Sequence, residues 1–186
     1  MPPFHLLAVC TGNICRSPQA EYILRSKLAA AGLSSLTSVG SCGIEGHNGW
    51  PADSRSQRTA EAAGFSLAAH RARALDSEDL QHSGLLLALD TGHLQALRRL
   101  PGGAAKARLL MDFCGLEKPG QALQAGRSIV DPYYEDAPVF ESVLGEIMAS
   151  SDGLVAALGW LQQRKEPQEQ WTALLMGDLA ALRPAQ

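Results

Sequence analysis

Short apolar runs alternate along this chain with segments whose apolar residues recur at helical spacing. Four runs have the length and composition of buried parallel strands, and they cover residues 4–9, 36–41, 85–89 and 107–111. Helices are expected from Ser17-Pro18 to Gly32, over 53–63, after Asp76, over 91–100 and along the apolar stripe of residues 140–161. Strands that alternate with helices predict an α/β fold: a doubly wound, four-stranded parallel sheet with helices on both faces.

A polar stretch from Gln162 to Gln170 ends this pattern. The expected domain therefore covers residues 1–163, and residues 164–186 form a C-terminal extension with a short amphipathic helix. Its apolar stripe consists of Trp171, Leu174, Leu175, Leu179 and Leu182. We expect this stripe to pack on the chain's own domain, and the alternative is weak self-association or contact with a partner.

Composition and charge narrow the classes of function. The 186 residues are 46% hydrophobic and carry 16 basic against 19 acidic residues, a net charge of −3. This balance argues against nucleic-acid or anionic-membrane binding, and no apolar stretch is long enough to span a membrane. The four cysteines fit neither a zinc ribbon nor a secreted disulfide scaffold. We therefore expect a soluble, reduced, cytoplasmic protein without a metal, and any anion it binds must be held by a local device.

Residues 10–17 are the candidate for such a device, because they join the first strand to the first helix. Free backbone N–H groups at the helix start and the helix dipole favour an anion there. Gly12 and Asn13 tolerate a left-handed backbone, so the loop can turn its amides inward. A cation at this end opposes the dipole unless an anion lies between them, which makes Arg16 a candidate phosphate ligand. The same surroundings stabilise thiolate over thiol, so Cys10 is a candidate nucleophile.

The segment Val9 to Pro18, with Ala20-Glu21 after it, closely resembles the signature of low-molecular-weight protein tyrosine phosphatases. The resemblance continues, in the same order, through Ser41-Cys42-Gly43, residues 49–53, residues 70–73, Asp131-Pro132-Tyr133-Tyr134 and Phe140-Glu141. It implies that Cys10 is the nucleophile that becomes a phosphocysteine, in a reaction without a cofactor. It also implies that Arg16 and the loop amides bind the phosphoryl oxygens, through Thr11, Gly12, Asn13, Ile14, Cys15 and Arg16.

Further roles follow from the same resemblance. Asp131 is implied as the general acid and base. Ser17 is implied to donate to the Cys10 thiolate, and Asn13 to hold the loop in shape with support from Ser17, Ser41 and His70. The resemblance suggests a reversible, redox-sensitive disulfide between Cys15 and Cys10. Cys42 and Cys114 are expected to be buried, without a function.

The expected substrate is a protein that carries phosphotyrosine. Tyr133 and Tyr134 resemble the family's aromatic wall, which suits a flat phenyl ring above a deep phosphate pocket. Glu45-Gly46-His47 departs from the family pattern, because an aromatic residue commonly stands at the position of Gly46, and Trp50 is expected to replace it.

Three alternatives remain open. An arsenate reductase of the same fold needs a second, closely spaced cysteine pair, but residues 76–100 contain no cysteine and Cys114 is solitary. A phosphoarginine phosphatase of the family tends to carry threonine where this chain has Ile14. A non-catalytic phosphotyrosine-binding module would typically lack Cys10, Arg16 or Asp131, and all three are present.

Overall fold

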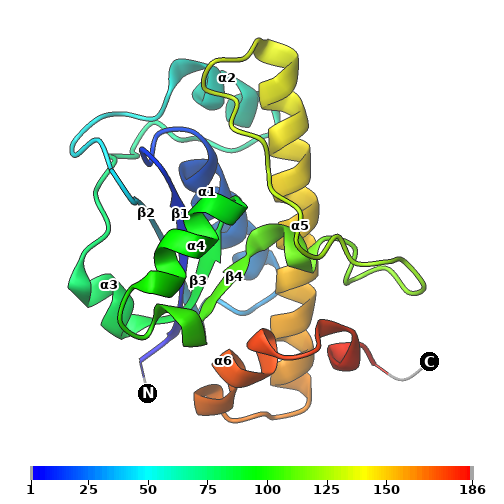
Figure 1. Cartoon of the computed structure of the whole chain (residues 1–186). Coiled ribbons are helices and arrows are strands. Elements are labelled where there is room, and N and C mark those ends of the chain that lie inside the picture. Colours follow the sequence, from blue (N-terminus) through cyan, green and yellow to red (C-terminus); the bar gives the residue numbers. More distant parts are fainter. Residues whose placement is uncertain (1, 185–186) are drawn as a thin grey trace.

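A four-stranded parallel sheet forms the centre of the computed structural model, which describes residues 2–184 (Figure 1). Its strands are β1 (Phe4–Cys10), β2 (Thr37–Gly43), β3 (Ser83–Ala88) and β4 (Ala107–Leu109). Their order is β2-β1-β3-β4, and every neighbouring pair is parallel. The fold class expected from the sequence is confirmed.

The order of the strands determines where a ligand site can lie. After β1 the chain pairs β2 with one edge of β1, and then places β3 against the other edge. The connections therefore leave in opposite directions beyond the carboxyl ends of β1 and β3, which opens a crevice at this switch point. The loop that follows Cys10 lies at this end of the sheet.

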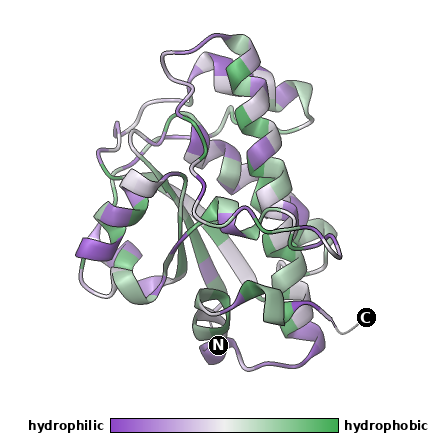
Figure 2. Cartoon of the chain, turned by 45° about the vertical axis from the view of Figure 1, so that its right-hand side comes forward, coloured by the Kyte–Doolittle hydropathy of each residue, from purple (hydrophilic) through white to green (hydrophobic). Residues whose placement is uncertain are grey.

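Helices cover both faces of the sheet (Figure 1). The helices are α1 (Arg16–Ala30), α2 (Ser54–Ala62), α3 (Ser77–His82), α4 (Thr91–Arg99), α5 (Ala137–Gln163) and α6 (Gln168–Met176). Short 3-10 helices cover Gly103–Ala105, Leu110–Phe113 and Leu179–Leu182. Successive strand residues point to opposite faces, so Leu6 and Ala8 pack in the core with α1 and α5, whereas Leu7 and Val9 pack towards α3 and α4. Hydrophobic and hydrophilic residues alternate along α5 in Figure 2, as expected for a helix with one buried side.

The start of α1 differs from the sequence-based expectation. The helix begins at Arg16, with Cys15 at the N-cap position and no side-chain cap, so Ser17 does not cap it. The hydroxyl of Ser17 is bound instead to groups of the loop, as described below. The end of the helix is as expected, because Gly32 follows it with a φ of 72°.

The last expected strand is also shorter than the apolar pattern indicates. Strand β4 ends at Leu109, and Leu110–Phe113 form a 3-10 helix whose apolar residues pack in the core beside α5. An apolar run by itself does not distinguish the two structures.

The C-terminal extension packs on the domain. Trp171 is 1% exposed, and its ring meets the ring of Phe4 edge-on with 5.5 Å between centroids. Arg108 of β4 donates hydrogen bonds to the carbonyl oxygens of Leu175 and Gly177. Of the apolar stripe, Leu175, Leu179 and Leu182 are buried in the same core cluster, and Leu174 packs against it. The stripe is therefore covered by the chain's own core, as the favoured expectation had it.

No helix in the described part of the chain is long and apolar enough to cross a membrane.

Candidate functional site

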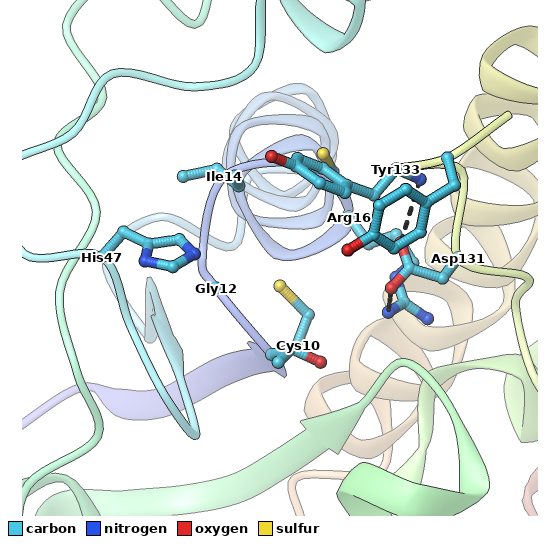
Figure 3. A pocket seen from close by; sticks show the side chains of 10 residues that line it. Cys10, Gly12, Ile14, Arg16, His47, Asp131 and Tyr133 are labelled. Carbon is cyan, nitrogen blue, oxygen red and sulfur yellow. Dashed lines mark hydrogen bonds and ion pairs between the residues drawn. The ribbon is translucent and has the colours of Figure 1, made fainter. Parts of the chain in front are cut away.

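The thiol of Cys10 points into a cavity of about 350 Å³ at the carboxyl end of β1 (Figure 3). Figure 3 shows His47 on one side of this cavity and Asp131 with Tyr133 on the opposite side. The cavity is lined by Cys10, Thr11, Gly12, Ile14, Cys15, Arg16, His47, Asp131, Tyr133 and Tyr134. Most of the residues expected to bind phosphate therefore line one cavity; Asn13 is not among them and is fully buried.

Asn13 holds the loop in its tight curve. Its φ of 58° lies in the left-handed region, which costs free energy for any residue with a Cβ atom. Its side-chain amide donates to the hydroxyl oxygens of Ser17 and Ser41, each at 2.9 Å. His70 Nε2 donates to the Asn13 carbonyl oxygen at 2.7 Å, and the Arg73 backbone N–H donates to Asn13 Oδ1 at 2.9 Å. The structure thus brings together all the supporting residues expected from the sequence and adds the backbone of Arg73.

The same hydrogen bonds orient the hydroxyl of Ser17 towards the cysteine. Ser17 Oγ lies 2.9 Å from Cys10 Sγ and 3.3 Å from the carbonyl oxygen of Cys42. Because Asn13 donates to Ser17 Oγ, the single proton of this hydroxyl is shared between two acceptors, the Cys42 carbonyl oxygen and the Cys10 sulfur. A thiolate is the stronger acceptor of the two and draws the proton towards the sulfur. Burial lowers the pKa of His70, so its imidazole is neutral at pH 7 and donates through Nε2.

Arg16 lies at the floor of the site and is only 2% exposed. Its Nη1 is 2.9 Å from Asp90 Oδ2 and donates to the Ile129 carbonyl oxygen at 3.0 Å. Its Nη2 is 2.9 Å from Asp131 Oδ2 (Figure 3). The guanidinium is therefore held in one orientation by two carboxylates and a carbonyl, with its charge compensated inside the protein.

Asp90 is a site residue that the sequence analysis missed. It is the N-cap of α4, where its Oδ1 accepts the backbone N–H of His93 at 2.8 Å. It follows β3 at the carboxyl edge of the sheet, beside the end of β1. That position, next to an expected strand, is the signal that could have identified it.

Asp131 and the two tyrosines form the side of the cavity opposite His47. The side chain of Asp131 is half exposed, and its Oδ1 accepts the backbone N–H of Tyr133 at 3.2 Å. The rings of Tyr133 and Tyr134 meet edge-to-face with 4.9 Å between centroids. Arg55 of α2 donates to the Tyr133 carbonyl oxygen at 2.9 Å, which ties this loop to α2.

His47 stands where Trp50 was expected. A Cβ atom on Gly46 would lie 2.1 Å from the carbonyl oxygen of Arg73, so no side chain fits at that position. The imidazole of His47 lines the cavity instead, and it stacks on the indole of Trp50 with 4.8 Å between centroids and 24° between planes. Trp50 is 56% exposed and is not among the cavity-lining residues, so it contributes to this wall only through His47.

All four cysteines carry free thiols. Burial raises the pKa of Cys15 to about 12, and it raises the pKa of Cys42 further, so both are thiols at neutral pH. Cys42 is fully buried, as expected, whereas Cys114 is only half-buried. The expectation for Cys114 was wrong because it follows the 3-10 helix, at the start of a long surface loop.

Comparison with known proteins agrees with this geometry. Residues 5–164 match the family model described as low molecular weight phosphotyrosine protein phosphatase. A low molecular weight protein-tyrosine-phosphatase of Streptomyces coelicolor is 39% identical over 159 residues, covering 83% of this chain and 93% of the relative.

Solved structures show the same fold. A low molecular weight protein tyrosine phosphatase from T. tengcongensis is 30% identical with a TM-score of 0.71, covering 82% of this chain and 98% of that chain. The YwlE arginine phosphatase from Geobacillus stearothermophilus is 28% identical with a TM-score of 0.74, covering 89% and 98%. From the family model and the level of identity, this chain belongs to the low molecular weight phosphotyrosine protein phosphatase family.

Proposed function

We propose that this phosphatase hydrolyses phosphotyrosine in proteins through a phosphocysteine at Cys10. One observation carries the proposal: three groups converge on one cavity. They are the thiol of Cys10, the buried Arg16 in an inward-turned loop, and the half-exposed carboxylate of Asp131. Such a site provides a nucleophile, a cradle for oxyanion charge and a proton donor within reach of one bound phosphate.

In the first step the Cys10 thiolate attacks phosphorus. The sulfur–phosphorus bond forms while the bond to the tyrosine oxygen breaks. Asp131 acts here in the protonated form that each completed second step regenerates, and it gives that proton to the leaving oxygen, so tyrosine leaves neutral. Arg16 and the amides of residues 11–16 hold the equatorial oxygens, where charge is spread in the transition state. The Ser17 hydroxyl, 2.9 Å from the sulfur, stabilises the thiolate before attack and as it reforms.

In the second step water attacks the phosphocysteine. Asp131, now a carboxylate, takes a proton from the water as the oxygen–phosphorus bond forms and the sulfur–phosphorus bond breaks. Phosphate leaves, and Cys10 returns to the thiolate. Every charge in this sequence is met by Arg16, Asp131 or loop amides, so the reaction needs neither a metal nor a cofactor.

The walls of the cavity support an aromatic substrate. His47 with Trp50 behind it and Tyr133 flank the space above Cys10, and a phenyl ring fits between two such faces. Phosphoarginine is the second candidate, because the arginine phosphatase YwlE shares the fold. The apolar side chain of Ile14 at the cavity favours phosphotyrosine over this alternative.

The setting of the reaction is also part of the proposal. A site that depends on a free thiol at Cys10 fits the reducing cytoplasm. Oxidation would inactivate it, and a disulfide between Cys10 and Cys15 would make that inactivation reversible. Since the C-terminal apolar stripe is buried in its own domain, self-association through it is not part of the proposed function.

Hydrolysis of a phosphotyrosine peptide and of a phosphoarginine peptide by the wild type tests the assignment. We expect the tyrosine substrate to have the higher kcat/KM, and Cys10→Ser to lose at least about 10⁴-fold in kcat while a Cys114→Ser control keeps it. Faster turnover of phosphoarginine would favour the second candidate. Turnover retained in Cys10→Ser would contradict the phosphocysteine, and binding of both peptides without turnover by the wild type would favour a non-catalytic module.

A further inference from the structure

A buried histidine lies against the side of the phosphate loop that faces α4. His93, on the first turn of α4, is 6% exposed, and its Nε2 lies 2.9 Å from Thr11 Oγ1. Thr11 directly follows Cys10 and lines the cavity. This contact is separate from the hydrogen bonds around Asn13, which hold the middle of the loop from the direction of β2 and the 70–73 segment.

The other side of the His93 ring faces Asp90. Nδ1 lies 3.0 Å from Asp90 Oδ1, a close electrostatic contact whose geometry is not that of a hydrogen bond, and the same oxygen accepts the backbone N–H of His93. The second oxygen of Asp90 holds Arg16 Nη1 at 2.9 Å. His93 therefore stands between the first residue of the loop and the carboxylate that orients the arginine.

The charge state of His93 determines the direction of the bond to Thr11. Burial lowers the pKa of His93, the nearby Asp90 and Asp131 raise it, and Arg16 lowers it. The net lowering makes the ring neutral at pH 7. A proton on Nδ1 then faces the carboxylate of Asp90, and Nε2 accepts the hydroxyl proton of Thr11.

We propose that His93 is a positioning residue, which links Thr11 to the Asp90–Arg16 ion pair so that the loop and the guanidinium present one rigid site to an oxyanion. The inference rests on the proposed function, because it assigns oxyanion binding to this loop. His93 touches neither the reacting sulfur nor the cavity surface, so it acts through Thr11 and Asp90 alone.

Replacements that each keep one half of the ring's contacts test the proposal. In His93→Gln the amide reaches the place of Nε2 and keeps the bond to Thr11, whereas in His93→Asn it reaches only the place of Nδ1. We expect His93→Asn to raise KM for p-nitrophenyl phosphate and the inhibition constant of sulfate by about threefold to tenfold, the range expected for one hydrogen bond, with kcat changed less than about twofold. In His93→Gln we expect both the KM and the sulfate inhibition constant to match those of the wild type at pH 7. His82→Asn, which replaces an exposed histidine, is the matched control.

A double-mutant cycle identifies the path of the effect. Thr11→Val removes the hydroxyl and keeps the shape, so we expect the same rise in the sulfate constant and no further rise in Thr11→Val with His93→Asn. The pH profile supplies an independent readout, because sulfate stays doubly charged between pH 5 and 8. Burial lowers the pKa of His93, so the ring gains a proton only at acidic pH, and the added positive charge then lies beside Asp90, the partner of Arg16. Sulfate affinity should therefore rise more on acidification in the wild type than in His93→Gln.

Binding measured without turnover separates this inference from the proposed reaction. Sulfate-dependent thermal stabilisation gives the affinity in the wild type and in Cys10→Ser, even if neither hydrolyses a phosphotyrosine peptide. Unchanged sulfate affinity in His93→Asn, or additive effects in the double mutant, would overturn the role of His93. A loss of melting temperature in His93→Asn and His93→Gln alike, with sulfate affinity intact, would leave His93 as a core residue only and would also overturn it.

Discussion

The carboxylate of Asp131 lies 2.9 Å from Nη2 of Arg16, so the proposed proton donor is paired with the proposed phosphate ligand. The arginine is buried while the side chain of Asp131 is half exposed. A phosphate that binds Nη2 competes with this carboxylate, while Asp90 on Nη1 keeps the guanidinium in place. In the proposed mechanism, phosphate binding therefore favours release of Asp131 towards the leaving oxygen.

Removing the charge of Asp131 should have opposite effects on binding and on catalysis. In Asp131→Asn, sulfate no longer competes with a carboxylate, so its inhibition constant should fall by about twofold to fivefold, the range for a partly exposed ion pair. The kcat for a phosphotyrosine peptide should fall by about 10²- to 10⁴-fold, because the amide gives no proton. Hydrolysis of p-nitrophenyl phosphate, whose leaving group needs no proton, should fall much less. Equal losses on both substrates would contradict the acid role.

His47 should contribute more to substrate binding than Trp50 does. Loss of one aromatic stacking partner costs about twofold to tenfold in affinity. We expect this rise in KM for a phosphotyrosine peptide in His47→Ala, a smaller rise in Trp50→Ala, and recovery in His47→Phe. Steady-state kinetics with the three variants checks the order. A larger effect of Trp50→Ala would restore the sequence-based assignment of that residue to the wall.

These residues also show how far the sequence predicts the site. The strand, the loop and the helix around Cys10 were predictable because each has a local signal. The strand is an apolar run, the loop contains Gly12-Asn13, and a proline stands near the start of the helix. Asp90 was not found, because an aspartate before a helix is sufficiently explained as an N-cap, and its contact with Arg16 spans 74 residues. Likewise, the residues next to Ser17 suggest a helix cap. Its place beside the thiol followed only from the family resemblance, and the structure has its hydroxyl 2.9 Å from Cys10 Sγ.

The sequence assigned the wall opposite Tyr133 to Trp50, whereas the structure lines the cavity there with His47. Which of several consecutive loop residues faces a cavity depends on the backbone path. Here Gly46 packs tightly against the backbone of Arg73, and the backbone N–H of His47 donates to the Gly12 carbonyl oxygen. Hydrophobic periodicity has no bearing on that path. The fold was therefore more predictable than the cavity, since strands and helices follow local patterns while the cavity is made by segments distant in sequence.

Stability should fall on mild acidification. Burial lowers the pKa of His5, His70 and His93 in the folded protein, whereas in the unfolded chain each returns to about 6.5. The stability that the neutral rings contribute is complete above about pH 6.5, and it is lost as the pH falls towards the folded-state values, because the unfolded chain then binds more protons. Melting temperatures between pH 7.5 and 5 should fall, with a shallower slope in His70→Gln and an unchanged one in His82→Gln. Equal slopes in the wild type and His70→Gln would contradict the buried neutral histidine.

The C-terminal helix should matter for stability and not for assembly. Trp171 is almost fully buried, so Trp171→Ala should lower the free energy of unfolding by about 3–5 kcal/mol. Glu169 is an exposed neighbour, so Glu169→Ala should change the free energy of unfolding by less than about 0.5 kcal/mol. Urea denaturation gives both values. Sedimentation at several concentrations should show that the wild type and Glu169→Ala do not associate through the apolar stripe. A concentration-dependent dimer that Trp171→Ala abolishes would contradict the burial of the stripe in its own domain.

The two loop cysteines should differ sharply towards alkylating agents. Both thiols line the cavity and both are buried, so the difference between them must come from protonation. The pKa of Cys15 is raised to about 12, so it is almost entirely protonated at pH 7 and iodoacetamide should leave it unmodified, whereas Cys10, whose sulfur lies 2.9 Å from the Ser17 hydroxyl, should react. Sulfate should protect Cys10, and peptide mass spectrometry locates the label. The same pKa bears on the expected disulfide, because the Cys15 thiolate must attack oxidised Cys10. After peroxide treatment the yield of the Cys10–Cys15 disulfide should rise between pH 6 and 9, and no disulfide should form in Cys15→Ser. A disulfide yield that does not depend on pH would contradict a buried, protonated Cys15 thiol. Alkylation of Cys15 before Cys10 would contradict it as well.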